Sequence, residues 1–191
     1  MNRAVFLDRD GVINEMFFDA IRNEHRPPHF IEEIKFINGS IDAIKMLNEN
    51  KFYVFVISNQ PDHAKGKTDI TNLYKVKDYI KMMLDINKCI ISEYYYCYHH
   101  PEGIIIGYNK KCECRKPGTL YVENAIESYN INRENSFFIG DREADILCGK
   151  NSGLKTIFIE NKIYKLEKSV SPDIKSDDLI SAVKKILNTY E

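Results

Sequence analysis

Short apolar runs, rich in β-branched and aromatic residues, alternate along this chain with stretches in which apolar residues recur every three or four positions. The runs predict buried strands, and the spaced positions predict helices with one apolar face. Strands that alternate with helices favour right-handed βαβ units and a parallel sheet covered on both faces, a doubly wound, Rossmann-like α/β fold. Strands are expected at 4–7, 52–57, 94–98, 136–139 and 156–159, and helices near 41–47, 73–83, 120–126 and 146–147, with a last helix from Asp177 to about Tyr190.

Composition and net charge exclude some classes of binding partner, but they add little about the fold. With 191 residues, 43% hydrophobic and 29% charged, the chain is typical of a globular protein, and no repeat or linker divides it. We therefore expect one domain over residues 1–191. A formal net charge of −1 provides no basic track for nucleic acid and no attraction to a membrane surface. The apolar run at the N-terminus is too short for an export signal or a membrane span, so we expect a cytoplasmic monomer that acts on small molecules.

Polar residues that follow the expected strands carry the candidate chemistry, because ligands of such sheets bind beyond the carboxyl ends of the strands. Asp8 and Asp10 follow the first strand in a turn where Gly11 permits a close approach to a ligand. Several carboxylates in one pocket repel one another unless a cation neutralises them, and Mg²⁺ suits oxygen ligands. The residues expected to meet at this edge are Asp8, Asp10, Ser58, Asn59, Arg115, Lys116 and Asp141.

This set of side chains fits phosphoryl transfer. An aspartate can attack phosphorus to give an aspartyl phosphate, while a metal ion and a lysine stabilise the charge on the transferring oxygens. A second carboxylate can then carry the proton. Taken alone, Asp8 and Asp10 would also fit a surface turn, Ser58 a helix cap and Lys116 a solvated charge. The order in which these residues and Asp141 follow successive strands favours one shared catalytic site over these separate roles.

The cysteine pattern points to a second metal. Five cysteines in a chain without an export signal argue against a disulfide framework. Three of them form the pattern Cys-x-His, twelve residues, Cys-x-Cys. Three thiolates and one imidazole make a closed tetrahedral Zn²⁺ set, which is typical of a structural ion. The expected ligands are Cys97, His99, Cys112 and Cys114, with His100 as an alternative to His99, while Cys89 and Cys148 are expected in the core.

Four motifs in order resemble the haloacid dehalogenase superfamily, and within it the D-glycero-D-manno-heptose 1,7-bisphosphate phosphatase and histidinol-phosphatase subgroup, over about residues 3–159. The resemblance implies that Asp8 is the nucleophile and Asp10 the general acid and base. It implies that Mg²⁺ is held by Asp8, the backbone carbonyl of Asp10 and Asp141. The subgroup carries the same zinc pattern just before Arg-Lys-Pro. The motifs are Leu7-Asp8-Arg9-Asp10-Gly11-Val12-Ile13-Asn14, Ser58-Asn59-Gln60, Cys-x-Cys-Arg115-Lys116-Pro117 and Gly140-Asp141-x-x-x-Asp145.

The resemblance also implies that Ser58 and Lys116 stabilise the phosphoryl group and that Arg115 contacts the substrate. Asn59 is expected to bind the phosphate or the substrate with them. Asp145 is left open, because it fits an outer carboxylate of the site, a helix cap or a solvent-exposed side chain equally well. The spacing between motifs leaves no room for a large cap domain, so specificity is expected from residues 15–30, residues 61–66 and the zinc loop.

These loops also depart from the subgroup. No Gly-Tyr-Val-His-like segment is found in the first, residues 61–66 read Pro-Asp-His-Ala-Lys-Gly, and the stretch after Pro117 is short. The sugar and its anomer therefore stay open. The leading hypothesis is removal of the C7 phosphate of heptose 1,7-bisphosphate in the biosynthesis of nucleotide-activated (ADP or GDP) heptose. The alternatives are a histidinol-phosphate or other small-metabolite phosphatase, and a non-catalytic zinc-stabilised binding module.

Overall fold

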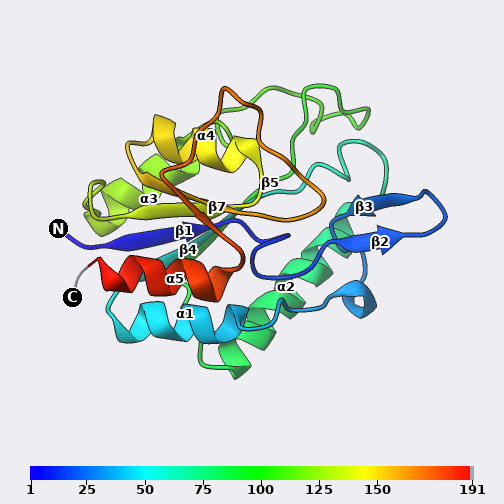
Figure 1. Cartoon of the computed structure of the whole chain (residues 1–191). Coiled ribbons are helices and arrows are strands. Elements are labelled where there is room, and N and C mark those ends of the chain that lie inside the picture. The colour runs from blue at the N-terminus through cyan, green and yellow to red at the C-terminus, as the bar shows by residue number, and fades with distance from the viewer. Residues whose placement is uncertain (190–191) are drawn as a thin grey trace.

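Six parallel strands form the central sheet of the computed structural model, which describes residues 1–189 (Figure 1). They are β1 (Ala4–Leu7), β4 (Tyr53–Asn59), β5 (Glu93–Cys97), β6 (Phe137–Gly140), β7 (Lys155–Ile159) and β8 (Ile174–Ser176). The strand order is β5-β4-β1-β6-β7-β8, so the first strand of the chain lies in the interior of the sheet. Every neighbouring pair is parallel, as the alternation of strands and helices predicts.

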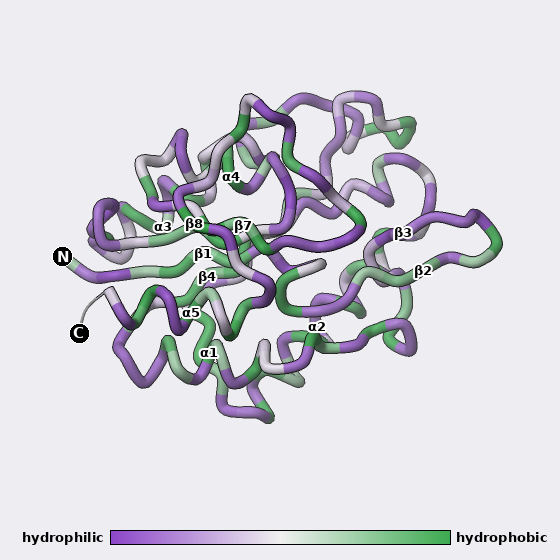
Figure 2. Tube along the Cα trace, in the orientation of Figure 1, coloured by the Kyte–Doolittle hydropathy of each residue, from purple (hydrophilic) through white to green (hydrophobic). Residues whose placement is uncertain are grey.

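The interior strands are apolar on both faces because both faces are covered. In β1, Val5 and Leu7 belong to one core cluster, while Ala4 and Phe6 belong to the other. This alternation is the period of two of an extended chain. All four side chains are fully buried, and the strands appear as hydrophobic segments in Figure 2. An uninterrupted apolar run therefore indicates a strand between two layers of helices.

Helices cover both faces of the sheet, which confirms the doubly wound α/β fold. On one face pack α1 (Ser40–Glu49), α2 (Ile70–Ile86) and α5 (Leu179–Asn188), and on the other α3 (Leu120–Tyr129) and α4 (Glu143–Asn151) (Figure 1). Two of them begin at aspartate caps: Asp69 accepts from the backbone N of Thr71 and Asp178 from that of Ser181. Each expected helix is present, although Tyr190, expected near the end of the last one, lies outside the described residues. Within residues 1–189, no helix is both long and apolar enough to cross a bilayer.

Four short elements were not predicted. The antiparallel hairpin of β2 (Phe17–Asp19) and β3 (Glu24–Arg26), followed by a short 3-10 helix (Ile31–Glu33), projects at one side of the molecule (Figure 1). Strand β8 extends the sheet beyond β7. Each of these strands has three residues and none is an apolar run, so the sequence pattern gave no signal for them. As expected, no cap domain interrupts residues 1–189.

Candidate active site

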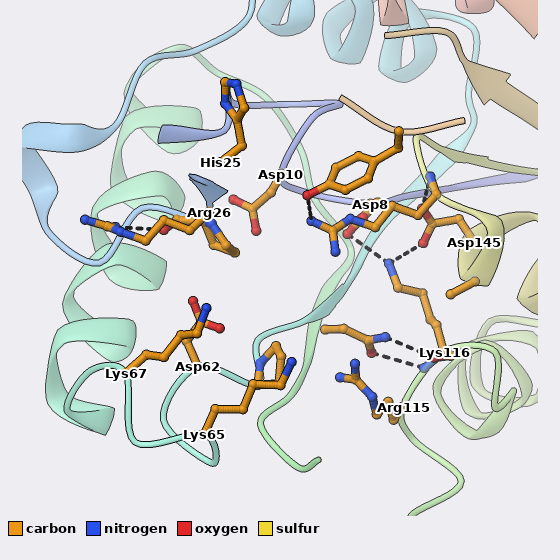
Figure 3. Close-up of a pocket in the computed structure, with 16 residues that line it drawn as sticks. Asp8, Asp10, His25, Arg26, Asp62, Lys65, Lys67, Arg115, Lys116 and Asp145 are labelled. Carbon is orange, nitrogen blue, oxygen red and sulfur yellow. Dashed lines mark hydrogen bonds and ion pairs between the residues drawn. The ribbon is translucent and has the colours of Figure 1, made fainter. Parts of the chain in front are cut away.

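The ends of β1 and β6 place three aspartates beside one lysine. Asp8 follows β1, Asp141 follows β6, and Asp145 lies in the first turn of α4. Their carboxylate oxygens lie within 4.8 Å of one another. Lys116 Nζ lies 2.8 Å from Asp8 Oδ1 and 2.7 Å from Asp145 Oδ1 (Figure 3). It also donates to the carbonyl of Ile57 at 2.6 Å. Because the lysine and the three aspartates are buried, the lysine compensates charge that water does not reach.

One lysine does not offset three buried carboxylates. Burial, together with the charge of Asp8, raises the pKa of Asp145 to about 6 and holds the pKa of Asp141 well above its ordinary value. Burial alone would lower the pKa of Lys116, but Asp145 and Asp8 outweigh it and raise that pKa. Among residues 1–189, the buried Oδ1 of Asp141 has no hydrogen-bond partner. An unpartnered oxygen within an excess of carboxylates fits a divalent, oxygen-liking cation such as Mg²⁺.

Gly11 allows the turn after β1 to approach the third carboxylate. Its φ of +85° lies in the left-handed region that favours glycine. A Cβ atom at this position would overlap the carboxylate of Asp141. Because β1 and β6 are paired neighbours, the glycine of the first motif leaves the space in which the Asp141 carboxylate packs against the turn after β1.

Asp10 is held apart from this cluster by a hydrogen-bond network. The buried Arg9 guanidinium donates to Asp10 Oδ1 through Nε at 3.0 Å and to both carboxylate oxygens through a terminal nitrogen at 2.9 Å. Asn14 Nδ2 donates to Oδ1 at 2.9 Å, and Gln60 Nε2 donates to Oδ2 at 2.6 Å. These contacts fix the orientation of the carboxylate. Arg9, Asn14 and Gln60 were given no role from the sequence, and their only signal was their place inside the motifs.

The two polar residues at the end of β4 have different surroundings. The Asn59 amide accepts from the backbone N of Lys116 and donates to its backbone carbonyl, both at 3.0 Å. Although Asn59 also lines the cavity, its side chain is engaged with the chain and fixes the lysine backbone. Ser58 is buried, and its Oγ accepts from Gln60 Nε2 at 2.9 Å. Asn59 thus acts on the site through Lys116, a role that sequence analysis missed.

Asp8, Asp10, Asp145 and Lys116 line a cavity of about 230 Å³ (Figure 3). Its size suits a small metabolite, and its basic side chains suit an anion. The hairpin adds His25 and Arg26 to the wall, and the segment after β4 adds Lys65 and Lys67. Burial lowers the pKa of Arg115, the sequence-predicted substrate contact, whose guanidinium also donates to the carbonyl of His99 at 3.5 Å. The basic residues that line the cavity are Arg26, Lys65, Lys67, Arg115, Lys116 and Arg142.

Asp145, left open by the sequence, is fully buried and has two partners. Its Oδ2 accepts from the backbone N of Arg142 at 3.0 Å, which caps the start of α4, and its Oδ1 faces Lys116. It is therefore both a helix cap and a member of the carboxylate cluster. The solvent-exposed interpretation was wrong for this residue.

The second predicted metal set is also brought together. The sulfur of Cys97 lies 3.5 Å from that of Cys112 and 3.4 Å from that of Cys114, and the last two lie 3.2 Å apart. His99 Nδ1 lies 3.9 Å from Cys97 Sγ and 3.6 Å from Cys114 Sγ. In a tetrahedral site with Zn–S bonds of about 2.3 Å, neighbouring sulfurs lie about 3.8 Å apart, so small movements would admit the ion. All five cysteines are free, and the four groups could hold Zn²⁺.

The neighbouring histidine and the two remaining cysteines lie outside this cluster. His100 Nδ1 accepts from the backbone N of Glu102 at 3.1 Å, so it serves a local turn, and His99 joins the cluster. Cys89 and Cys148 are buried, as expected for core residues. The zinc pattern in the sequence therefore selected the residues that meet in space.

Two relatives match most of this chain in sequence. The D-glycero-D-manno-heptose-1,7-bisphosphate 7-phosphatase of Chlorobaculum tepidum is 34% identical over 95% of this chain and 92% of its own. The D-glycero-beta-D-manno-heptose-1,7-bisphosphate 7-phosphatase of Haemophilus ducreyi is 32% identical over 81% of this chain and 80% of its own. The chain belongs to the heptose-bisphosphate phosphatase family of the haloacid dehalogenase superfamily.

Further comparisons agree with membership of this phosphatase family. The model of the HAD-hydrolase-like family matches residues 113–186. The crystal structure of the D,D-heptose 1,7-bisphosphate phosphatase from B. bronchiseptica, complexed with magnesium and phosphate, superimposes with a TM-score of 0.76 and 21% identity, covering 98% of this chain and 99% of that one. At this identity the superposition establishes the fold alone. The chain is thus a hydrolase-fold phosphatase whose candidate site lies where the family's motifs meet.

Proposed function

We propose that this chain hydrolyses the C7 phosphate ester of D-glycero-D-manno-heptose 1,7-bisphosphate through an aspartyl phosphate on Asp8, as one monomeric domain. The single observation that carries the proposal is the buried cluster of Asp8, Asp141, Asp145 and Lys116, of which Asp8, Asp145 and Lys116 line a basic cavity. The relatives at 32% and 34% identity supply the substrate, since both are heptose-bisphosphate phosphatases.

Asp8 is suited to attack phosphorus because its two oxygens are differently engaged. Oδ1 accepts from the backbone N of Arg9 at 2.7 Å and faces Lys116, while no hydrogen bond among residues 1–189 goes to Oδ2. Oδ2 forms the bond to phosphorus as the bond to the sugar oxygen breaks, and Asp10 gives the leaving oxygen a proton. Asp10 then takes a proton from the water that releases inorganic phosphate and restores Asp8.

Lys116 and the carboxylates would handle the charge of the transferring group. Lys116 stabilises phosphoryl oxygens once substrate competes for its ammonium group, and we propose the same role for the Ser58 hydroxyl. Asp8, Asp141 and the backbone carbonyl of Asp10 would hold Mg²⁺, with Asp145 beside them. When bound, Mg²⁺ supplies positive charge that stabilises the transition state.

The zinc cluster would support catalysis through structure. Cys114 immediately precedes Arg115 and Lys116 in the chain. An ion held by Cys97, His99, Cys112 and Cys114 therefore fixes the segment that carries the phosphate-binding lysine. We propose Zn²⁺ in this structural role.

Phosphate release in the presence of Mg²⁺ tests the function. The α and β anomers of heptose 1,7-bisphosphate are compared with fructose 1,6-bisphosphate and histidinol phosphate, because the relatives include 7-phosphatases of either anomer. We expect turnover of one heptose anomer to exceed the others, and Asp8→Asn to abolish it. Preference for histidinol phosphate, or turnover that survives Asp8→Asn, would refute the proposal.

A further inference from the structure

Tyr164 turns inward from a segment whose neighbouring side chains are exposed. It lies between β7 and β8, where Lys162, Ile163 and Lys165 are exposed but Tyr164 is half-buried. Tyr164 lines the cavity that contains Asp8, Asp10 and Lys116. No family motif includes this residue, and the sequence gave it no role.

Arg142 holds the tyrosine ring and hydroxyl in place. The Arg142 guanidinium lies 4.1 Å from the centre of the Tyr164 ring, and one of its terminal nitrogens donates to Tyr164 Oη at 2.7 Å. Arg142 directly follows Asp141 and lines the same cavity. Because the hydroxyl accepts from Arg142, its own proton is available to another acceptor, and no hydrogen bond among residues 1–189 uses it. Burial raises the pKa of Tyr164, which keeps the phenol protonated as a donor.

Asn161 connects this tyrosine to the carboxylate cluster. Its Nδ2 donates to Asp141 Oδ2 at 3.0 Å, and its Oδ1 accepts from the backbone N of Ile163 and of Tyr164, both at 2.8 Å. One side chain therefore fixes a catalytic carboxylate and the turn that presents Tyr164. Asn161 thus sets the position of Tyr164 relative to the Asp141 carboxylate as well as to its own loop.

We propose that Tyr164, oriented by Arg142, is a specificity-determining residue that donates a hydrogen bond to an oxygen of the sugar in the phosphorylated substrate. This inference rests on the proposed function and deepens it. A donor prepositioned beside the phosphoryl site favours substrates with an oxygen within its reach over phosphate alone. A site built to bond a hydroxyl discriminates strongly against ligands that lack it.

The competing explanation is that Tyr164 only tethers the segment between β7 and β8. A tether would change the melting temperature and would affect all ligands alike. A specificity role would change the preference between ligands, which stability does not report. The two explanations are therefore separated by a ratio of affinities.

Calorimetry in the non-hydrolysing Asp8→Asn background with Mg²⁺ measures that ratio. Association constants are determined for heptose 1,7-bisphosphate, fructose 1,6-bisphosphate and inorganic phosphate, with and without Tyr164→Phe. Tyr53→Phe is the matched control, because Tyr53 begins β4 at the end of that strand opposite to Ser58 and packs edge-on against Tyr129. Turnover of heptose 1,7-bisphosphate by the chain with Asp8 intact is measured separately. A result that refutes the proposed substrate can then be told apart from a result that refutes the role of Tyr164.

We expect Tyr164→Phe to lower the preference for the better-bound sugar bisphosphate over inorganic phosphate about tenfold, as for loss of one hydrogen bond. Tyr53→Phe leaves that preference unchanged. An unchanged preference in Tyr164→Phe, with or without a lower melting temperature, overturns the inference. If heptose 1,7-bisphosphate is not hydrolysed, the proposed function falls, while the fructose-to-phosphate ratio still decides the role of Tyr164.

Discussion

The aspartate cluster and the Cys/His cluster each bring together groups that repel one another when ionised. The two clusters differ in whether a side chain of opposite charge balances that repulsion. In the aspartate cluster, Lys116 supplies a positive charge 2.7–2.8 Å from two of the carboxylates. In the Cys/His cluster, the three sulfur atoms contact one another and His99. Burial also raises the pKa of the Cys97 thiol, which disfavours a bare thiolate.

This difference indicates which site depends on its ion for structure. The carboxylates are anchored at the ends of β1 and β6 and paired with a lysine, so we expect them to be arranged before Mg²⁺ binds. Cys97 ends β5, but the other three members of the Cys/His cluster lie in the stretch 98–114, which contains no strand, so we expect Zn²⁺ to order this stretch. Loss of the first ion should cost activity and loss of the second should cost both activity and stability.

Removing the nucleophile should have the largest effect on rate. Asp8→Asn is expected to lower kcat by about 10⁴-fold or more, because the covalent step is lost. The melting temperature should change little, since Lys116 keeps Asp145 as a partner. Phosphate release and thermal unfolding measure the two effects. An active Asp8→Asn enzyme would show that this cluster is not where the phosphoryl group is transferred.

Replacing Lys116 tests whether this lysine balances the negative charge of the aspartate cluster. Lys116→Met leaves Asp8 and Asp145 buried with no lysine, and we expect a loss of about 3–5 kcal/mol in the free energy of unfolding. Lys81→Met is the matched control, because Lys81 pairs with Asp85 on an exposed helix face, where such pairs contribute little. Urea unfolding measures the free energy of unfolding of both variants. Equal losses in the two variants would mean that the buried lysine has no special role.

Removing zinc tests the other cluster. Cys112→Ser is expected to lower zinc content, melting temperature and kcat together, because the segment that carries Lys116 loses its anchor. A loss of 1 kcal/mol shifts the melting temperature by about 2–4 °C in a chain of this size, so a shift of several degrees is expected. Cys89→Ser, outside the cluster, should retain zinc. Full activity in zinc-free protein would contradict the proposal that zinc fixes the segment that carries Lys116.

The Asn59 contact can be separated from ordinary stabilisation by an internal control. Asn59 and Asn48 each hold another residue's backbone N–H and C=O, Lys116 in one case and Ile90 in the other. Alanine at either position should cost about 1–3 kcal/mol in unfolding free energy. Only Asn59→Ala should also lower kcat, by about tenfold, because a displaced lysine stabilises the transition state less well. Similar kcat values in the two variants would reduce Asn59 to a structural residue.

Sequence reasoning was most successful where the fold itself brings residues together. Asp8 and Asp141 were placed correctly because parallel strands bring their carboxyl ends to one edge. The four residues of the candidate zinc set could be predicted to meet because they lie within eighteen residues, 97–114, and the structure brings them together. In both cases topology or short spacing determines proximity, and no side-chain rotamer has to be known.

The roles that sequence reasoning missed depend on side-chain direction. An asparagine after a strand can bond a substrate or a backbone, and only the position of Lys116 shows that Asn59 bonds the backbone. Asp145 was similarly ambiguous until its burial was known. Tyr164 lies in a loop with no periodic pattern, and its contact with Arg142 spans 22 positions. Such contacts follow from the packed structure and not from a local motif.

Asp173, which lies outside both clusters, shows what hydrogen bonds achieve for a carboxylate that is not paired with a buried lysine, and we expect the smallest effect there. Asp173 Oδ2 accepts from the backbone N and the hydroxyl of Thr156, at 2.7 and 2.6 Å. Burial would raise the pKa of Asp173, but these bonds outweigh it and lower the pKa. The ionised form is thus favoured in the folded state. Its stabilisation is complete above the unfolded pKa of about 3.9 and is lost as the pH falls through the lower folded value.

Urea unfolding of the unsubstituted chain and of Asp173→Asn, between pH 7 and pH 3, measures this contribution. The unsubstituted chain should be slightly more stable at pH 7, and the difference should shrink below about pH 4 as the carboxylate protonates. Because Asp173 is largely exposed, solvent screens the effect and it should stay well below that of Lys116→Met. A difference that grows on acidification would contradict the assignment. A difference as large as that of Lys116→Met would show that hydrogen bonds alone can compensate a carboxylate as well as the buried lysine does.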